Sequence, residues 1–193
     1  MVHWGVSPLK DRSPGDELDL VTSLWLLAAL FAVTIGYPLL VLVHELGHAL
    51  VVLACGRSAE AAVGDSRRGM RIAIGRLGVS IGLFKLAGSC TYDSDGLTIR
   101  QRKNVVLGGP VASALAAAVL ALAAYLVADP SGPLFWLLAA GAAVAAVHAA
   151  DTAWPRRGRH SERSDGAQLR RLRSFEPHFV PPRRKGEAIR RLR

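Results

Sequence analysis

His44 and His48 lie four residues apart, and Glu45 directly follows the first histidine. On a helix this spacing places both imidazoles on one face, where they can bind a single metal ion. A glutamate next to the first histidine is suited to act as a general base toward a water molecule that the metal polarises. The three residues therefore predict zinc-assisted hydrolytic chemistry.

A zinc site of this kind needs a third protein ligand. Asp165 and Asp151 are the main candidates, and His148 is a more distant third. Spacing does not choose between the two aspartates. Asp165 could instead cap a helix that starts just after it, and Asp151 could instead end a membrane segment. The position of the third ligand therefore stays open at this point.

The surroundings of the histidine pair are apolar from Pro38 to Cys55. Ionisable groups inside such a segment are costly in hydrocarbon and are usually kept for a function. Further apolar blocks cover residues 105–128 and 133–151, and 51% of the whole chain is hydrophobic. We therefore expect an all-α polytopic membrane protein with three to four transmembrane helices.

The first apolar block, residues 18–55, is too long for one simple span. As a straight helix it would measure about 57 Å, against about 30 Å for a hydrocarbon core. The sequence Gly36-Tyr37-Pro38 could bend one long helix, or it could reverse the chain between two spans. A reversal within lipid would leave backbone groups unpaired, so we favour one bent helix.

Residues 56–104 differ in kind, because charged residues alternate there with short apolar stretches. Residues 71–74 and 79–83 alternate with period two, which predicts two to four short strands. The Asp95-Gly96 pair predicts a hairpin turn between strands at 90–92 and 97–99. We expect a small β-rich insertion on the cytoplasmic or interfacial side of the membrane.

The rest of the chain is polar and mostly basic, and the net charge is +9. We expect residues 1–17 to form a flexible tail, 156–176 to carry an Asp-Gly segment and an interfacial helix, and 177–193 to form a disordered basic tail. The positive-inside rule places both basic segments, and hence the C-terminus, in the cytoplasm. Aromatic residues are not interleaved with the basic ones, so we expect no nucleic-acid partner.

Three motifs in order resemble the site-2 protease family of intramembrane zinc metalloproteases. These are His44 to Leu50 (HELGHAL), Leu107-Gly108-Gly109-Pro110 at the start of the second apolar block, and Pro155 followed by Asp165-Gly166. The likeness extends over about residues 38–170. It implies that His44, His48 and Asp165 bind Zn²⁺ and that Glu45 activates water. It also implies that a substrate helix unwinds and lies extended near residues 70–100.

The chain departs from the family pattern at two positions, where Ser113 and Thr152 stand in place of asparagines. The resemblance implies a substrate-positioning role there. We expect an intramembrane zinc-dependent endopeptidase that cleaves a membrane-spanning protein. The alternative is a catalytically weak or inactive homologue that binds helices or regulates another protein. We expect the chain in the bilayer of a bacterial plasma membrane, with a membrane protein substrate and a regulatory membrane protein as partners.

Overall fold

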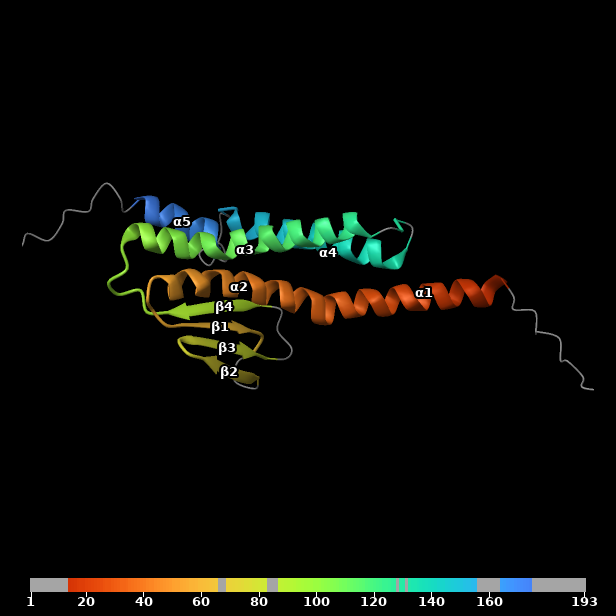
Figure 1. Cartoon of the computed structure of the whole chain (residues 1–193), viewed down its shortest axis with the longest axis horizontal. Coiled ribbons are helices and arrows are strands. Elements are labelled where there is room, and N and C mark those ends of the chain that lie inside the picture. The colour runs from red at the N-terminus through yellow and green to blue at the C-terminus, as the bar shows by residue number, and fades with distance from the viewer. Residues whose placement is uncertain are drawn as a thin grey trace, which may run out of the picture.

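A computed structural model describes residues 14–65, 69–82, 87–127, 129–130, 132–155 and 164–174. The chain is mostly helical, with a small sheet inserted between the second and third helices. Figure 1 shows the sheet on one side of α2 and the later helices on the other. The elements are α1 (Pro14–Phe31), η1 (Ala32–Gly36), α2 (Tyr37–Ala54), β1 (Ala59–Val63), β2 (Met70–Ile74), β3 (Leu77–Ile81), β4 (Gly88–Tyr92), α3 (Ile99–Leu126), α4 (Pro133–Ala153) and α5 (Asp165–Ser174).

The first apolar block forms one continuous helical run through α1, η1 and α2, so the expectation of a single helix is confirmed. Residues 14–17, expected in the N-terminal tail, are its first turn. At the place where a bend was expected, just before Pro38, the helix makes a π-helical turn in which the Tyr37 amide donates to the Ala32 carbonyl. Because proline lacks an amide hydrogen, regular α-helical pairing is interrupted there, and a π turn accommodates the change.

In the part of the chain that the structure describes, three helices are long and apolar enough to cross a membrane, judged by length and composition. They cover Trp25–Ala54, Ile99–Leu126 and Pro133–Ala153. Their outer faces carry exposed apolar side chains such as Leu26, Leu115 and Val147. Such faces are suited to contact with lipid. The three helices agree with the expected three to four spans.

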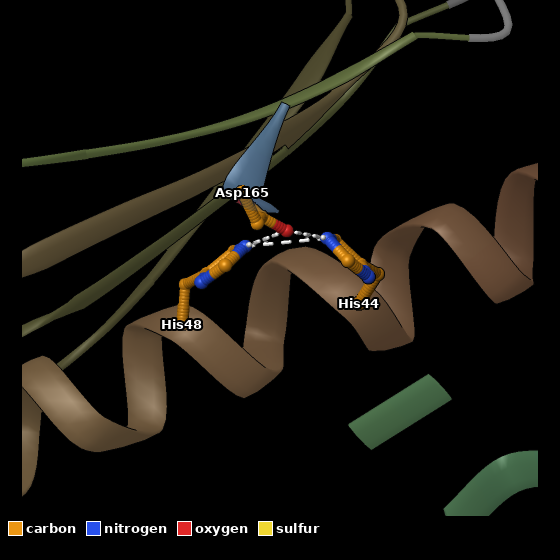
Figure 2. A group of neighbouring side chains, drawn as sticks. All are labelled: His44, His48 and Asp165. Atoms are coloured by element: carbon orange, nitrogen blue, oxygen red, sulfur yellow. Dashed lines mark hydrogen bonds and ion pairs between the residues drawn. The ribbon is translucent and has the colours of Figure 1, made fainter. Parts of the chain in front are cut away.

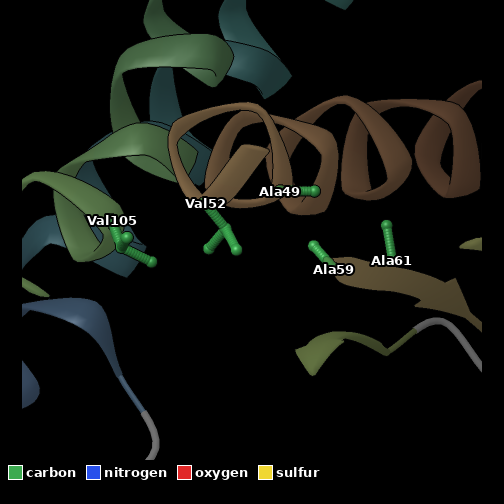
Figure 3. Packing of buried hydrophobic residues seen from close by; sticks show 5 residues of the cluster. All are labelled: Ala49, Val52, Ala59, Ala61 and Val105. Carbon is green, nitrogen blue, oxygen red and sulfur yellow. The ribbon is translucent and has the colours of Figure 1, made fainter. Parts of the chain in front are cut away.

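The sheet has the strand order β2-β3-β1-β4. Strand β1 pairs parallel with β3 and antiparallel with β4, while β2 pairs antiparallel with β3. A small apolar core joins the sheet to α2 and the start of α3, as Figure 3 shows. The small side chains on β1 let the strand lie close to α2. The core residues are Ala49, Val52, Ala59, Ala61 and Val105.

The hairpin predicted between residues 90–92 and 97–99 is wrong. Asp95 and Gly96 do form a turn, with Gly96 at φ 79°, but the chain leaves it as a helix. Thr98 caps α3, since its hydroxyl accepts from the Gln101 amide at 3.2 Å and the Gln101 side chain accepts from the Thr98 amide at 2.9 Å. This capping box outweighs the β propensity of residues 97–99, so α3 begins before residue 105.

Helices α2 and α3 approach each other most closely at two glycines. A Cβ atom on Gly47 would collide with the Gly108 carbonyl oxygen and with Ala112, and one on Gly108 would collide with the Gly47 carbonyl oxygen. Backbone therefore packs on backbone at this crossing, as small residues allow between membrane helices. Because Gly47 lies inside the histidine motif, the same contact sets the distance from α3 to the metal-binding candidates.

Candidate metal centre

Three donor atoms meet between α2 and the start of α5, as Figure 2 shows. Oδ2 of Asp165 lies 3.0 Å from Nε2 of His44 and 3.4 Å from Nε2 of His48, and the two Nε2 atoms are 3.2 Å apart. All three side chains are buried. Zinc bonds of about 2.0–2.1 Å place tetrahedral ligand atoms about 3.3–3.4 Å apart. The triangle therefore fits one face of a zinc tetrahedron.

The hydrogen bonds behind the two histidines determine which ring nitrogen faces the triangle. His48 Nδ1 lies 2.7 Å from the Val105 carbonyl oxygen, which can only accept, so Nδ1 carries the hydrogen. The Gly109 amide also lies 3.3 Å from this nitrogen, but a protonated Nδ1 cannot accept a hydrogen bond. We therefore assign the hydrogen bond of Nδ1 to the shorter contact, the one with the Val105 carbonyl oxygen. His44 Nδ1 lies 2.9 Å from the Ser113 hydroxyl, which can accept in the same way. Both Nε2 lone pairs then point at the carboxylate, and three converging acceptors are the environment that a cation satisfies.

Asp165 is well suited to be the anionic member of this group. Burial raises the pKa of its carboxyl. Before a metal binds, His44 and His48 can carry a proton on Nε2, and the hydrogen bonds and positive charges of these protonated rings outweigh burial and hold the pKa of Asp165 below its usual value. The carboxylate is therefore ionised at neutral pH, as a metal ligand must be.

Gly109 on α3 keeps the space beside the triangle open. A Cβ atom at this position would collide with Nε2 of His48 and would lie 2.6 Å from Nε2 of His44. These are the atoms that would bind a metal. The site therefore requires a residue without a side chain at position 109, which gives a physical reason for the second glycine of the Leu107-Gly108-Gly109-Pro110 motif.

Asp165 reaches the histidines because α5 starts tightly against the end of α4. A Cβ atom on Gly166 would collide with the Ala153 carbonyl oxygen and lie close to Pro155. The Ser164 hydroxyl accepts from the Ala167 amide at 3.3 Å, which supports the first turn of α5. The helix expected within residues 156–176 thus corresponds to α5.

Asp151, the other candidate for the third ligand, is not brought to the histidines. It lies at the exposed end of α4, beside a shallow hollow lined by Val147, Ala150 and Trp154. Among the described residues, the group that could hold a metal ion consists of His44, His48 and Asp165.

Glu45 is buried beside the triangle and lines the same pocket, whose volume is about 540 Å³. On its other side Glu45 packs against β4, since a Cβ atom on Gly88 would lie 2.5 Å from Glu45 Oε1. Strand β4 also contributes Cys90, whose pKa is raised to about 12 by burial and then by the negative charge of Glu45. Burial likewise raises the pKa of Tyr92. The described cysteines, Cys55 and Cys90, are not joined in a disulfide.

The two positions where asparagine was expected have different surroundings. Ser113 is buried and contacts His44 Nδ1, as described above. Thr152 lines the pocket, but its hydroxyl donates to carbonyl oxygens of its own helix, those of His148 at 2.9 Å and Ala149 at 3.2 Å. His148 also lines the pocket. From the sequence, His148 was a distant candidate for the third ligand, with donation of a hydrogen bond across the bundle as the alternative. Its four-residue spacing from Thr152 is the signal that places both on one helix face.

The profile of Peptidase family M50 matches residues 30–179 of the chain. This range contains the histidine motif, the close glycine crossing and Asp165. No curated protein matches the chain.

Proposed function

The chain belongs to Peptidase family M50, the site-2 protease family of metalloproteases, and from this premise we propose that it is an intramembrane zinc-dependent endopeptidase that cleaves a membrane-spanning protein. The observation that carries the proposal is the buried group of His44, His48 and Asp165 with Glu45 beside it. Its donor atoms have the spacing that zinc requires, and the pocket in front of it is large enough to admit part of a peptide.

Each residue of the group has a distinct role in the proposed reaction. His44, His48 and Asp165 hold the metal, and bound zinc supplies a Lewis acid that polarises a peptide carbonyl and makes water more acidic. Glu45 accepts the proton of the attacking water and returns it to the leaving amine. The Val105 carbonyl and Ser113 orient the two imidazoles, as outer hydrogen-bond partners do at many zinc sites. In this proposal Ser113 positions a ligand, which differs from the substrate-positioning role that the resemblance implies.

The substrate would bind in extended form beside β4. Within the described residues β4 pairs on one edge with β1, and residues 88–90 of β4 line the pocket. An edge strand presents unpaired backbone groups that an extended peptide can use. Unwinding of the substrate helix is also needed for chemical reasons, because the hydrogen bonds of a helix shield its peptide bonds.

The proposed setting is a bacterial plasma membrane with the C-terminus in the cytoplasm. The three apolar helices support an integral membrane protein. Helix α5 carries Arg170, Arg171 and Arg173, and the positive-inside rule then favours the cytoplasmic side for this end. A membrane protein is the proposed substrate, and a regulatory membrane protein remains a proposed partner.

A second candidate function is that of a weak or inactive homologue that binds helices. One observation favours it: the hydroxyl of Thr152 is engaged by its own helix and does not offer a donor to the pocket. The complete set of His44, His48, Asp165 and Glu45 opposes it, since a binding protein has no need of a buried general base beside three metal donors.

The test uses the full chain purified in detergent and loaded with zinc. We expect about one zinc ion per chain by elemental analysis, and cleavage of dye-quenched casein and of a single-span reporter. Glu45→Gln should retain zinc and lose at least about 100-fold in activity, because the general base is absent. Unchanged proteolysis in Glu45→Gln, or a wild-type protein that binds no zinc, would contradict the proposal.

A further inference from the structure

The polar side chains that α4 presents to the pocket are His148 and Thr152. We propose that His148 donates a hydrogen bond to the carbonyl oxygen of the peptide bond that is cleaved, and that it does so in place of the asparagine expected at position 152. The inference rests on the proposed peptidase function and adds a substrate-contacting residue to it.

His148 stands beside the metal group without belonging to it. Its ring packs edge-on against His44, with ring centroids 5.0 Å apart, and against Tyr37 at 6.0 Å. The group of converging donor atoms does not include His148. A peptide that lies across His44 and His48 would therefore meet the imidazole of His148 at its side.

The Nε2 atom of His148 is buried and has no hydrogen-bond partner among the described residues. Buried polar atoms are almost always paired, so an unpaired one next to a pocket indicates a partner that arrives with a ligand. The side chain as a whole is half-buried and lines the pocket. The proposed hydrogen bond requires the ring to turn so that this nitrogen faces the bound peptide.

The two residues that replace asparagine are already engaged elsewhere. The hydroxyl of Thr152 donates to the His148 and Ala149 carbonyl oxygens, and Ser113 contacts His44 Nδ1 at 2.9 Å. The Thr152 hydroxyl is therefore not free to donate to a substrate, and Ser113, whose hydroxyl accepts from His44, does not line the pocket. His148 lies one helical turn before Thr152, so its side chain reaches the same region of the pocket. In this proposal the side chain that contacts the substrate therefore lies one helical turn earlier on α4 than the expected asparagine.

A donor at this place would act on the reacting carbonyl. As water adds to the carbonyl carbon, negative charge develops on the carbonyl oxygen, and a fixed N–H group stabilises this charge. His148 makes no covalent bond and keeps its proton, while Glu45 carries the proton of the water. The peptide would then lie between β4, which pairs with its backbone, and α4, which contacts its reacting carbonyl.

The experiment compares variants of the full-length, zinc-loaded protein with dye-quenched casein as the probe. We expect His148→Ala to keep its zinc and to lose about 100-fold in kcat/KM, mostly in kcat, because one carbonyl donor is removed. His148→Gln, which keeps an N–H donor, should retain at least about a tenth of the wild-type value. Adding Thr152→Asn to His148→Ala should raise kcat/KM at least about tenfold above that of His148→Ala alone, since the expected donor returns to the same helix face. Val147→Ala, a change at the exposed neighbour, is the matched control.

A second readout measures binding without turnover. In the Glu45→Gln background, fluorescence anisotropy of labelled casein should give a Kd that His148→Ala raises about threefold or more. Normal kcat/KM in His148→Ala, loss of its zinc, or no recovery with Thr152→Asn would each overturn the inference. If the zinc-loaded wild type does not cleave casein, the peptidase proposal itself fails, and an unchanged Kd in His148→Ala would then exclude the contact as well.

Discussion

The Nε2 atom of His44 lies 3.0 Å from Oδ2 of Asp165, although 121 residues separate them in the sequence. Helix α5 brings this carboxylate to α2 because Gly166 allows the start of α5 to pack against the end of α4. The contact completes a three-donor group that a histidine pair alone cannot form. The position of Asp165 therefore leads directly to an experiment that distinguishes it from Asp151.

Asp165→Ala should lose zinc, whereas Asp151→Ala should keep it. The first change removes the anionic donor of the buried triangle, and the loss of one ligand should weaken zinc binding at least about tenfold. The second change alters an exposed residue at the end of α4. Zinc titration with a chelating dye measures both affinities. A stronger effect of Asp151→Ala would contradict the assignment of the third ligand.

Gly109→Ala should also weaken zinc binding, although it removes no donor atom. The added methyl group would occupy the space against both Nε2 atoms, so the histidines must move apart or turn away. We expect at least about a tenfold weaker zinc affinity. Gly141→Ala is the matched control, because a Cβ atom there would meet Leu120 at an ordinary 3.4 Å. Equal zinc affinity in the two variants would count against the placement of the metal beside Gly109.

Much of this arrangement could be predicted from local sequence. The four-residue spacing of His44 and His48 follows from helix geometry, and the apolar blocks indicate the three candidate spans. The choice of Asp165 over Asp151 could not be derived from spacing, because it depends on how α5 packs after the chain leaves α4. Only the family resemblance favoured Asp165 over Asp151 beforehand.

Two features of the fold were harder to predict from the sequence. Residues 97–99 have strand-forming side chains, yet Thr98 and Gln101 form a capping box that starts a helix. Competition between two local preferences cannot be resolved by propensity alone. The strand order also could not be predicted. Strand β1 pairs in parallel with β3, although β2 comes between them in the sequence and lies on the other side of β3 in the sheet. Long-range pairing of this kind depends on the helix that the sheet packs against.

Gly108→Ala should destabilise the protein. The Cβ atom would press on the Gly47 carbonyl oxygen, and overpacking of this kind costs about 1–3 kcal/mol. Gly36→Ala has no atom within 4 Å of its added Cβ and should change stability by less than about 1 kcal/mol. Tryptophan fluorescence during thermal unfolding in detergent measures both. Equal unfolding temperatures would show that the α2–α3 crossing tolerates a side chain.

Cys90 should react slowly with alkylating reagents in zinc-free protein that carries Cys55→Ser. Its pKa is raised to about 12 by burial and by Glu45, and the thiolate is the reactive form. At pH 8 the thiolate fraction is then roughly one in 10,000, and the labelling rate should still rise about tenfold per pH unit at pH 10. An ordinary cysteine would already level off above pH 9. A plateau below pH 10 would contradict the buried position of this thiol.

The pair with Glu45 gives a separate check on the same thiol. Glu45→Gln removes the second cause of the raised pKa, so Cys90 should become more reactive at a given pH, with burial still keeping it below a free thiol. The comparison is made at pH 8 under the same labelling conditions. Slower labelling in Glu45→Gln would mean that the carboxylate does not face Cys90.

The separation of 121 residues between His44 and Asp165 has a consequence for how the protein is made. During synthesis His44 and His48 leave the ribosome long before the carboxylate that completes their group. A chain that is released early, or whose last helix fails to dock, has two histidines without the third donor. In the proposed function, the complete donor group and the tight metal binding that depends on it therefore form only after α5 has been synthesised and has docked against α4.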